Sequence, residues 1–207
     1  MKRKSFFLLF ALIIFTNGLF AQLGLKAGVN MASEIKSLSQ ADIAAGFSTN
    51  NLTGYQIGLV YQAMPKKSGL GVEIAALLSQ KGSTIDSTNL VNSITEGYKE
   101  LNYIEVPFNL RYRLSLGFIG VYGFAGVYGG YALSGKIVDE ITEVTENETF
   151  QSFMDHVDYG YNFGAGIELF KKIQLGGTWS QGLKNTSNST TTTTNNRVFS
   201  INLVYMF

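Results

Sequence analysis

The sequence contains no cysteine, only one histidine and only two prolines among its 207 residues. The missing cysteine excludes a lipid-anchored bacterial lipoprotein, a disulfide scaffold and a cysteine-based metal site. Because His156 is the only histidine, we predict no metal site, and a single imidazole is left for acid–base chemistry. No cofactor is predicted either.

Helical periodicity is also missing, because no stretch after residue 22 repeats apolar residues at helical spacing over four turns. The apolar run 6–15 is too short to cross a bilayer as a helix. It follows three basic residues at 2–4, an arrangement typical of a secretory signal peptide. We expect cleavage after Ala21, although Leu19 is larger than the small residue preferred there. An uncleaved membrane anchor is the alternative.

The chain has no large excess of charge of one sign. Of its sixteen Lys and Arg residues, three belong to the predicted signal peptide (1–21), which leaves thirteen basic residues against fifteen acidic ones. This near-neutral balance, about −2, gives no indication of a nucleic-acid partner. Residues 22–207 fit a single domain.

Apolar and polar residues alternate along much of the remaining chain, which is typical of β-strands. The last residues, RVFSINLVYMF, illustrate the pattern, because Phe199, Ile201, Leu203, Tyr205 and Phe207 share one face. We count eight such segments. They are approximately 23–31, 53–63, 69–82, 98–114, 118–136, 157–170, 173–184 and 197–207.

Short and long connections alternate between these segments. An antiparallel meander with such connections has every long loop at one end and both termini at the other, as in outer-membrane barrels with short periplasmic turns. Part of the acidic, alternating stretch 137–150 is expected to extend a hairpin. The tight turns are 65–69, 115–117 and 171–172, and the long connections are 32–52, 83–97, 137–156 and 185–196.

Alternation alone fits a soluble β-sandwich as well. Three features favour a membrane barrel: the polar faces carry charges and glycines, aromatic residues lie near strand ends as in an interfacial girdle, and a terminal strand that pairs with the first leaves no open edge. We therefore predict an eight-stranded antiparallel up-and-down transmembrane β-barrel in the bacterial outer membrane, with periplasmic termini. Its barrel-closing strand would carry Phe199, Ile201, Leu203, Tyr205 and Phe207.

The interior of an eight-stranded barrel is just wide enough for side chains to fill it. Seven charged residues have the parity to point inward, and we expect them to pair because an isolated buried charge is costly. A filled lumen and a narrow polar path are the two interpretations, of which we favour the first. The seven residues are Lys26, Glu73, Lys81, Glu105, Arg111, Arg113 and Glu168.

Two neighbouring segments, NYIEVPFNLRYRL (102–114) and GVYGFAGVYGGYALSGK (120–136), carry a family resemblance. With FAQ at 20–22 and LGLKAGVNMA at 23–32, the chain resembles the PorT-like, or porin-family, small outer-membrane barrels of Bacteroidetes from residue 22 to 207. Glu105 and Pro107 match the fourth strand of that pattern. The resemblance implies the fold and the outer membrane, and little about activity.

Two local features have structural explanations. Pro107 cannot donate to a strand ladder, so we predict a bulge or a local gap in the fourth strand. The glycine run 120–130 lacks the strand–turn–helix setting of a nucleotide-binding loop, so we expect it to serve close packing.

We predict a non-enzymatic outer-membrane protein that contributes to envelope structure or presents extracellular loops for binding. One alternative is an accessory barrel of a type IX secretion system. Another is a lipid-modifying enzyme that uses His156 with Asp158 and a serine such as Ser180. The expected partners are outer-membrane lipids and lipopolysaccharide, the barrel-assembly machinery and secretion-system components.

Overall fold

The computed structural model describes residues 19–36, 47–65, 69–88, 94–139, 144–147, 156–184 and 194–207, which form nine β-strands. None of the helices among these residues is long and apolar enough to cross a membrane. The strands are β1 (Leu19–Lys36), β2 (Phe47–Pro65), β3 (Gly69–Thr88), β4 (Ile94–Leu116), β5 (Ile119–Asp139), β6 (Val144–Asn147), β7 (Val157–Leu169), β8 (Ile173–Gly182) and β9 (Thr194–Met206).

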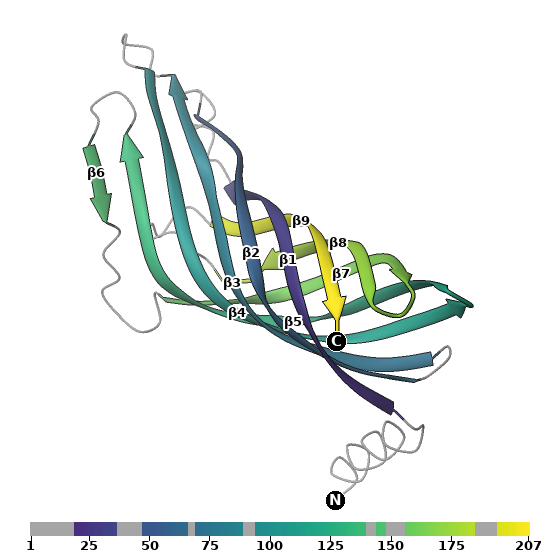
Figure 1. Ribbon diagram of the computed structural model, residues 1–207. Coiled ribbons are helices and arrows are strands. Elements are labelled where there is room, and N and C mark those ends of the chain that lie inside the picture. Colours follow the sequence, from purple (N-terminus) through teal and green to yellow (C-terminus); the bar gives the residue numbers. More distant parts are fainter. Residues whose placement is uncertain are drawn as a thin grey trace, which may run out of the picture.

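Eight of these strands close into a barrel (Figure 1). Around the wall their order is β1, β2, β3, β4, β5, β7, β8 and β9, and each pairs antiparallel with its neighbours. The seam between β9 and β1 runs from Met206 opposite Gly24 to Thr194 opposite Lys36. The Phe207 amide then donates to the Leu23 carbonyl at 2.9 Å. The predicted closed antiparallel barrel is confirmed.

The first strand overlaps the predicted signal peptide. β1 begins at Leu19, whereas we predicted cleavage after Ala21. Residues 1–18 lie outside the described residues, so the signal peptide and its boundary stay predictions.

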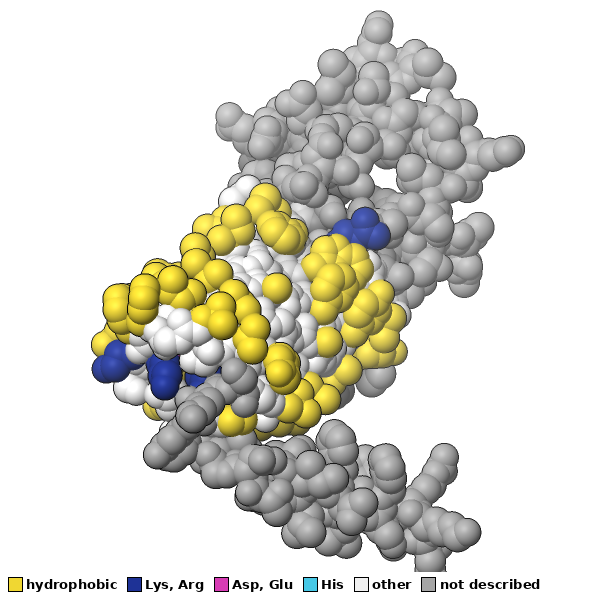
Figure 2. All heavy atoms as spheres, turned by 90° about the vertical axis from the view of Figure 1, so that its right-hand side faces the viewer, with side chains coloured by type: hydrophobic (Ala, Val, Ile, Leu, Met, Phe, Trp, Pro, Cys, Tyr) yellow, Lys and Arg dark blue, Asp and Glu magenta, His cyan; other side chains and the backbone are white. Residues whose placement is uncertain are grey.

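Alternation sorts the side chains to the two faces of the wall. On β2, Tyr55 and Leu59 are exposed outside the barrel, whereas Gln56 and Gln62 are buried inside it. Hydrophobic side chains cover much of the outer wall, and on the face shown in Figure 2 the Lys and Arg side chains lie only at its two ends. A protein with a polar interior and an apolar exterior is suited to a hydrocarbon solvent. The same exterior face on β9 carries the exposed Phe199, Ile201, Leu203 and Tyr205, and the exposed Phe207 follows the strand.

The strands β1 to β5 are longer than predicted at the long-loop end. β2, β3, β4 and β5 contain 19, 20, 23 and 21 residues, whereas β7, β8 and β9 contain 13, 10 and 13. Crossing a membrane takes about 9–11 residues of a tilted strand. The wall from β2 to β6 therefore rises past the ends of β7–β9 (Figure 1).

Backbone pairing in this raised wall explains why the predicted long connections were too long. The β3–β4 ladder continues to Thr88 opposite Ile94, inside the predicted connection 83–97. β6 pairs with β5 through Lys136–Asp139, so part of the stretch 137–150 does extend a hairpin, as predicted.

The two short turns that join β4 to β5 and β7 to β8 lie in contact. Gly117 has a φ of 82°, a conformation that suits glycine. Because β4 continues to Leu116, the first turn begins after that residue, whereas it was predicted at 115–117. In the second turn Phe170 and Lys171 have φ values of 54° and 60°. The Phe118 and Phe170 rings stack at 6.0 Å, which joins the turns.

The β3–β4 ladder is interrupted opposite Pro107. Pairing stops after Ile74 and Phe108. It resumes at Leu77 and Glu105 in the same register, so two positions on β3 have no partner on β4. A proline has no amide hydrogen to donate. Of the two predicted possibilities, the structure therefore has the local gap.

Candidate functional site in the barrel lumen

The lumen contains a balanced set of buried charges. The structure buries all seven charged residues that parity placed inside, together with Asp158. Since buried charges are stable only when compensated, equal numbers of the two signs favour a filled interior. The four cations are Lys26, Lys81, Arg111 and Arg113, and the four anions are Glu73, Glu105, Asp158 and Glu168.

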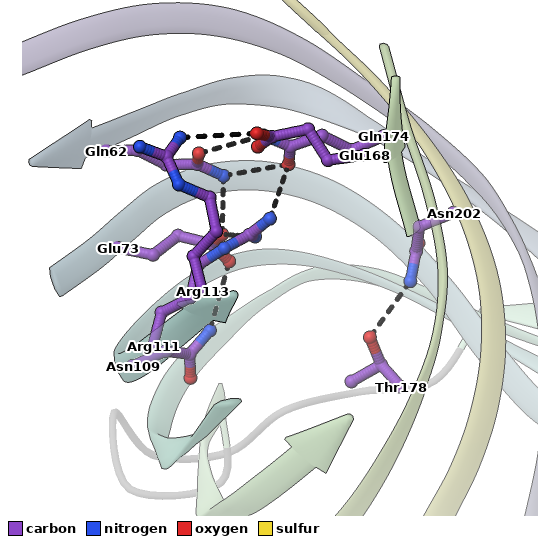
Figure 3. A network of polar contacts seen from close by, with 9 residues as sticks. All are labelled: Gln62, Glu73, Asn109, Arg111, Arg113, Glu168, Gln174, Thr178 and Asn202. Carbon is purple, nitrogen blue, oxygen red and sulfur yellow. Dashed lines mark hydrogen bonds and ion pairs between the residues drawn. The ribbon is translucent and has the colours of Figure 1, made fainter. Parts of the chain in front are cut away.

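One group of polar side chains fills the lumen near the short turns, and we call it the turn-end cluster. Two ion pairs anchor it: Arg111 Nη1 lies 2.7 Å from Glu73 Oε2, and Arg113 Nη1 lies 3.2 Å from Glu168 Oε1. Arg113 also donates through Nη2 to the Pro65 carbonyl. The cluster comprises Gln62, Glu73, Asn109, Arg111, Arg113, Glu168 and Gln174 (Figure 3).

Two glutamines connect the ion pairs of this cluster across the lumen. Gln62 on β2 and Gln174 on β8 exchange hydrogen bonds of 3.0 Å in both directions, although they are 112 residues apart. Gln62 also donates to Glu73 at 2.7 Å, and Gln174 donates to Glu168 at 3.1 Å. Arg111 Nη2 donates to Gln174 at 2.9 Å. The result is one network that spans the interior.

An aromatic ring covers the central arginine of the turn-end cluster. The Arg111 guanidinium lies 3.5 Å from the centroid of the Tyr122 ring, a cation–π arrangement. Tyr122 reaches this position because Gly166 on the neighbouring strand β7 and Gly176 on β8 leave room for its ring. A Cβ atom at either glycine would collide with the Tyr122 hydroxyl oxygen. The glycines on the inward faces of β7 and β8 therefore serve packing.

A smaller group, the loop-end cluster, lies further along the lumen and consists of Lys81, Glu105, Asp158 and Tyr128. Lys81 Nζ lies 2.9 Å from Glu105 Oε1 and 3.6 Å from Asp158 Oδ2. The Tyr128 hydroxyl donates to Asp158 Oδ2 at 3.4 Å. The Tyr128 ring also lies 4.6 Å from Lys81 Nζ. One lysine thus serves two carboxylates.

Neutral polar residues and Lys26 occupy the space between the two clusters. Asn30 donates to Ser79 at 3.1 Å and accepts from Ser200 at 2.8 Å. Asn202 donates to Thr178 at 2.9 Å (Figure 3). A cavity of about 20 Å³, lined in part by Lys26, remains here, and it has room for about one water molecule.

The three residues of the enzyme alternative have separate surroundings. His156 Nδ1 lies 2.8 Å from the Ala132 carbonyl, and its ring stacks on the exposed Tyr131 ring at 4.8 Å. Asp158 points into the lumen, where it contacts Lys81. Ser180 lines the central cavity. His156 thus contacts β5, and Asp158 contacts Lys81 on β3.

Sequence reasoning missed several members of the lumen network. Gln62, Gln174 and Asn109 lie at inward parity, but only the charged inward residues were selected as a network. Asp158 was assigned to His156 rather than to Lys81. The alternation of inward and outward positions could have identified these residues, if amide side chains had been considered together with charged ones.

No group of three or more His, Cys, Asp or Glu side chains suited to a metal ion occurs in the part of the chain that the structure describes. Every described ion pair joins two side chains from different strands.

A comparison with curated proteins gave no match. Among solved structures, the fold is similar to OprG from Pseudomonas aeruginosa, with 13% identity over 92% of this chain and 98% of that chain and a TM-score of 0.48. Neisserial surface protein A has 9% identity over 91% of this chain and 99% of its own chain, with a TM-score of 0.47. Ail of Yersinia pestis has 12% identity over 89% of this chain and 99% of its own chain, with a TM-score of 0.42.

A family model described as "Outer membrane protein beta-barrel domain" matches residues 15–188. This range contains most of the chain and seven of the eight barrel strands. The chain therefore belongs to the outer membrane protein β-barrel domain family and is located in the bacterial outer membrane.

Proposed function

We propose that this protein is a non-enzymatic barrel with a closed lumen, which contributes to envelope structure or presents its extracellular end for binding. The observation that supports this most directly is the turn-end cluster, where side chains from β2, β3, β4, β7 and β8 bond across the interior. The cavities beside it measure only about 10 and 20 Å³. A solute path would have to break ion pairs that are already desolvated.

The raised wall supports a role outside the membrane. Long loops of outer-membrane barrels are extracellular, and β2–β6 extend at that end. Because about 9–11 residues suffice to cross the bilayer, roughly half of each strand from β2 to β5 remains for the extracellular side. This wall gives the loops a paired, ordered base.

Conductance in planar bilayers tests the closed lumen. We expect the wild-type barrel to give no large steady current. Removing the central pair with Arg111→Ala and Glu73→Ala together should increase the open probability or conductance, whereas the outward-facing Ile57→Ala should not. A large steady current through the wild-type protein would contradict a closed lumen.

Surface exposure of the loops tests the second half of the proposal. An epitope inserted within residues 185–193 should be detected by antibody on intact cells, whereas the same epitope inserted in the short connection predicted at 65–69 should require permeabilised cells. The reverse result would contradict an extracellular long-loop end.

The narrower resemblance to PorT-like barrels of Bacteroidetes, and with it the secretion alternative, stays a prediction. A stable complex with secretion components under mild detergent is required by that alternative alone. The contacts of His156 give the enzyme alternative little support. Unchanged lipid A and phospholipids in a His156→Ala strain would end it.

A further inference from the structure

We propose that the lumen contains a binding site for a single water molecule between Lys26, Asn109 and Asn162. All three residues line the cavity of about 20 Å³ that lies between the two clusters. They are only 6%, 1% and 5% exposed. Each also has a polar group that no described residue satisfies. The proposal assigns a ligand to the interior and is independent of what the extracellular end binds.

Two amide oxygens at this cavity are buried without a hydrogen-bond partner among the described residues. They are Asn109 Oδ1 and Asn162 Oδ1. The amide nitrogen of Asn109 donates to Glu73 Oε1 at 3.2 Å, so the oxygen of this amide is directed away from Glu73 (Figure 3). Because an unsatisfied buried acceptor is destabilising, both oxygens call for a donor inside the cavity.

Lys26 reaches the same cavity from β1 and can supply hydrogen-bond donors. It is the one lumen cation that forms no ion pair within the described part of the chain. The charges of Glu73 and Glu105 act on it. However, Glu73 pairs with Arg111 at 2.7 Å, and Glu105 pairs with Lys81 at 2.9 Å. The three donors of the Lys26 ammonium are therefore available to a ligand.

The charge balance of the lumen favours a neutral ligand over an anion. The turn-end cluster has two carboxylates and two guanidinium groups, whereas the loop-end cluster has two carboxylates and one ammonium. The positive charge of Lys26 therefore offsets the excess negative charge of the loop-end cluster, and in a medium of low dielectric constant this attraction acts without direct contact. A bound chloride would leave the desolvated interior with a net negative charge, which is costly.

Water is the neutral ligand that fits both the size and the polarity of the cavity. A buried water needs about 10–15 Å³ of such space and two to four polar partners. The cavity offers about 20 Å³, one cationic donor and two amide acceptors. One water can accept from Lys26 and donate to both amide oxygens. It would thereby join β1, β4 and β7 between the two clusters.

A high-resolution crystal structure of the barrel, grown in the presence of sodium bromide, tests the site. We expect a density peak within hydrogen-bond distance of Lys26 Nζ and both amide oxygens, with no anomalous signal at the bromine absorption edge. Asn162→Leu should fill the cavity and abolish the peak. Gln174→Leu is the matched control, because Gln174 is also a buried inward amide but lines neither described cavity of the lumen, and the peak should persist.

Three results would overturn the proposal. The first is a wild-type structure without the peak, a measurement that needs no variant to fold. The second is an anomalous bromide signal beside Lys26, which would identify an anion as the ligand. The third is a peak that persists in Asn162→Leu, or that disappears equally in Gln174→Leu. A heat-modifiable shift on a gel verifies that each variant is folded.

Discussion

The two charged clusters of the lumen solve the same problem with different chemistry. The turn-end cluster uses two arginines whose planar groups bond to carboxylates and amides from several strands at once. The loop-end cluster uses Lys81, a compact charge that lies between two carboxylates and beside aromatic rings. A guanidinium fixes its partners in direction, whereas an ammonium does not. The turn-end cluster should therefore be the more rigid and more stabilising of the two.

The largest effect should come from Arg111→Met. This change leaves Glu73 buried without its cation, which typically costs about 3–5 kcal/mol. Urea unfolding of the barrel in lipid vesicles measures the loss. Combining Arg111→Met with Glu73→Gln should restore much of the stability, since no unpaired charge then remains. If Arg111→Met alone were as stable as wild type, the turn-end cluster would not be the more stabilising of the two.

Lys81→Met should cost less, about 3 kcal/mol, the lower end of the typical cost of breaking a buried ion pair, because an ammonium does not fix its partners in direction. Glu105 and Asp158 then lie together without a cation. The same urea unfolding assay measures the loss. A loss greater than that of Arg111→Met would reverse the order of the two clusters.

Gly176→Ala tests the packing beneath the turn-end cluster. The new Cβ would meet the Tyr122 hydroxyl and displace the ring that covers Arg111, so we expect a loss of about 1–3 kcal/mol. Gly177→Ala is the matched control, because its Cβ would lie 3.6 Å from the nearest Phe199 atoms, an ordinary contact. Equal stability of the two variants would show that the inward glycine has no packing role.

Tyr128→Phe should give the smallest effect. It removes the 3.4 Å hydrogen bond to Asp158 and keeps the ring beside Lys81, so we expect a loss of about 0.5–1 kcal/mol. The same unfolding assay measures it. A loss above 2 kcal/mol would mean that the hydroxyl, rather than the lysine, organises the loop-end cluster.

Much of the wall followed from the alternation of residues. The terminal segment from Phe199 to Phe207 identified a strand with one apolar face, and the alternation of short and long connections gave the meander. The raised wall was missed because the connections 83–97 and 137–156 are polar, and a paired strand above a membrane needs no apolar face. Register there is set by the neighbouring strand.

The sequence predicted which charged residues face the lumen better than it predicted which of them are in contact. Parity selects Glu73 and Arg111 as inward residues whatever their neighbours are. It does not reveal that Gln62 meets Gln174, because that contact depends on how far the strands are staggered when the sheet closes. For the same reason, the contact between Asp158 and Lys81 did not follow from the sequence, which offered Asp158 only as a partner of His156 in the enzyme alternative.

The sequence by itself determined which side of each strand meets lipid, because side chains alternate strictly along an extended backbone. Only the tertiary structure decided which inward charges pair, and at what height, because closure of the barrel brings together strands that lie far apart in the chain.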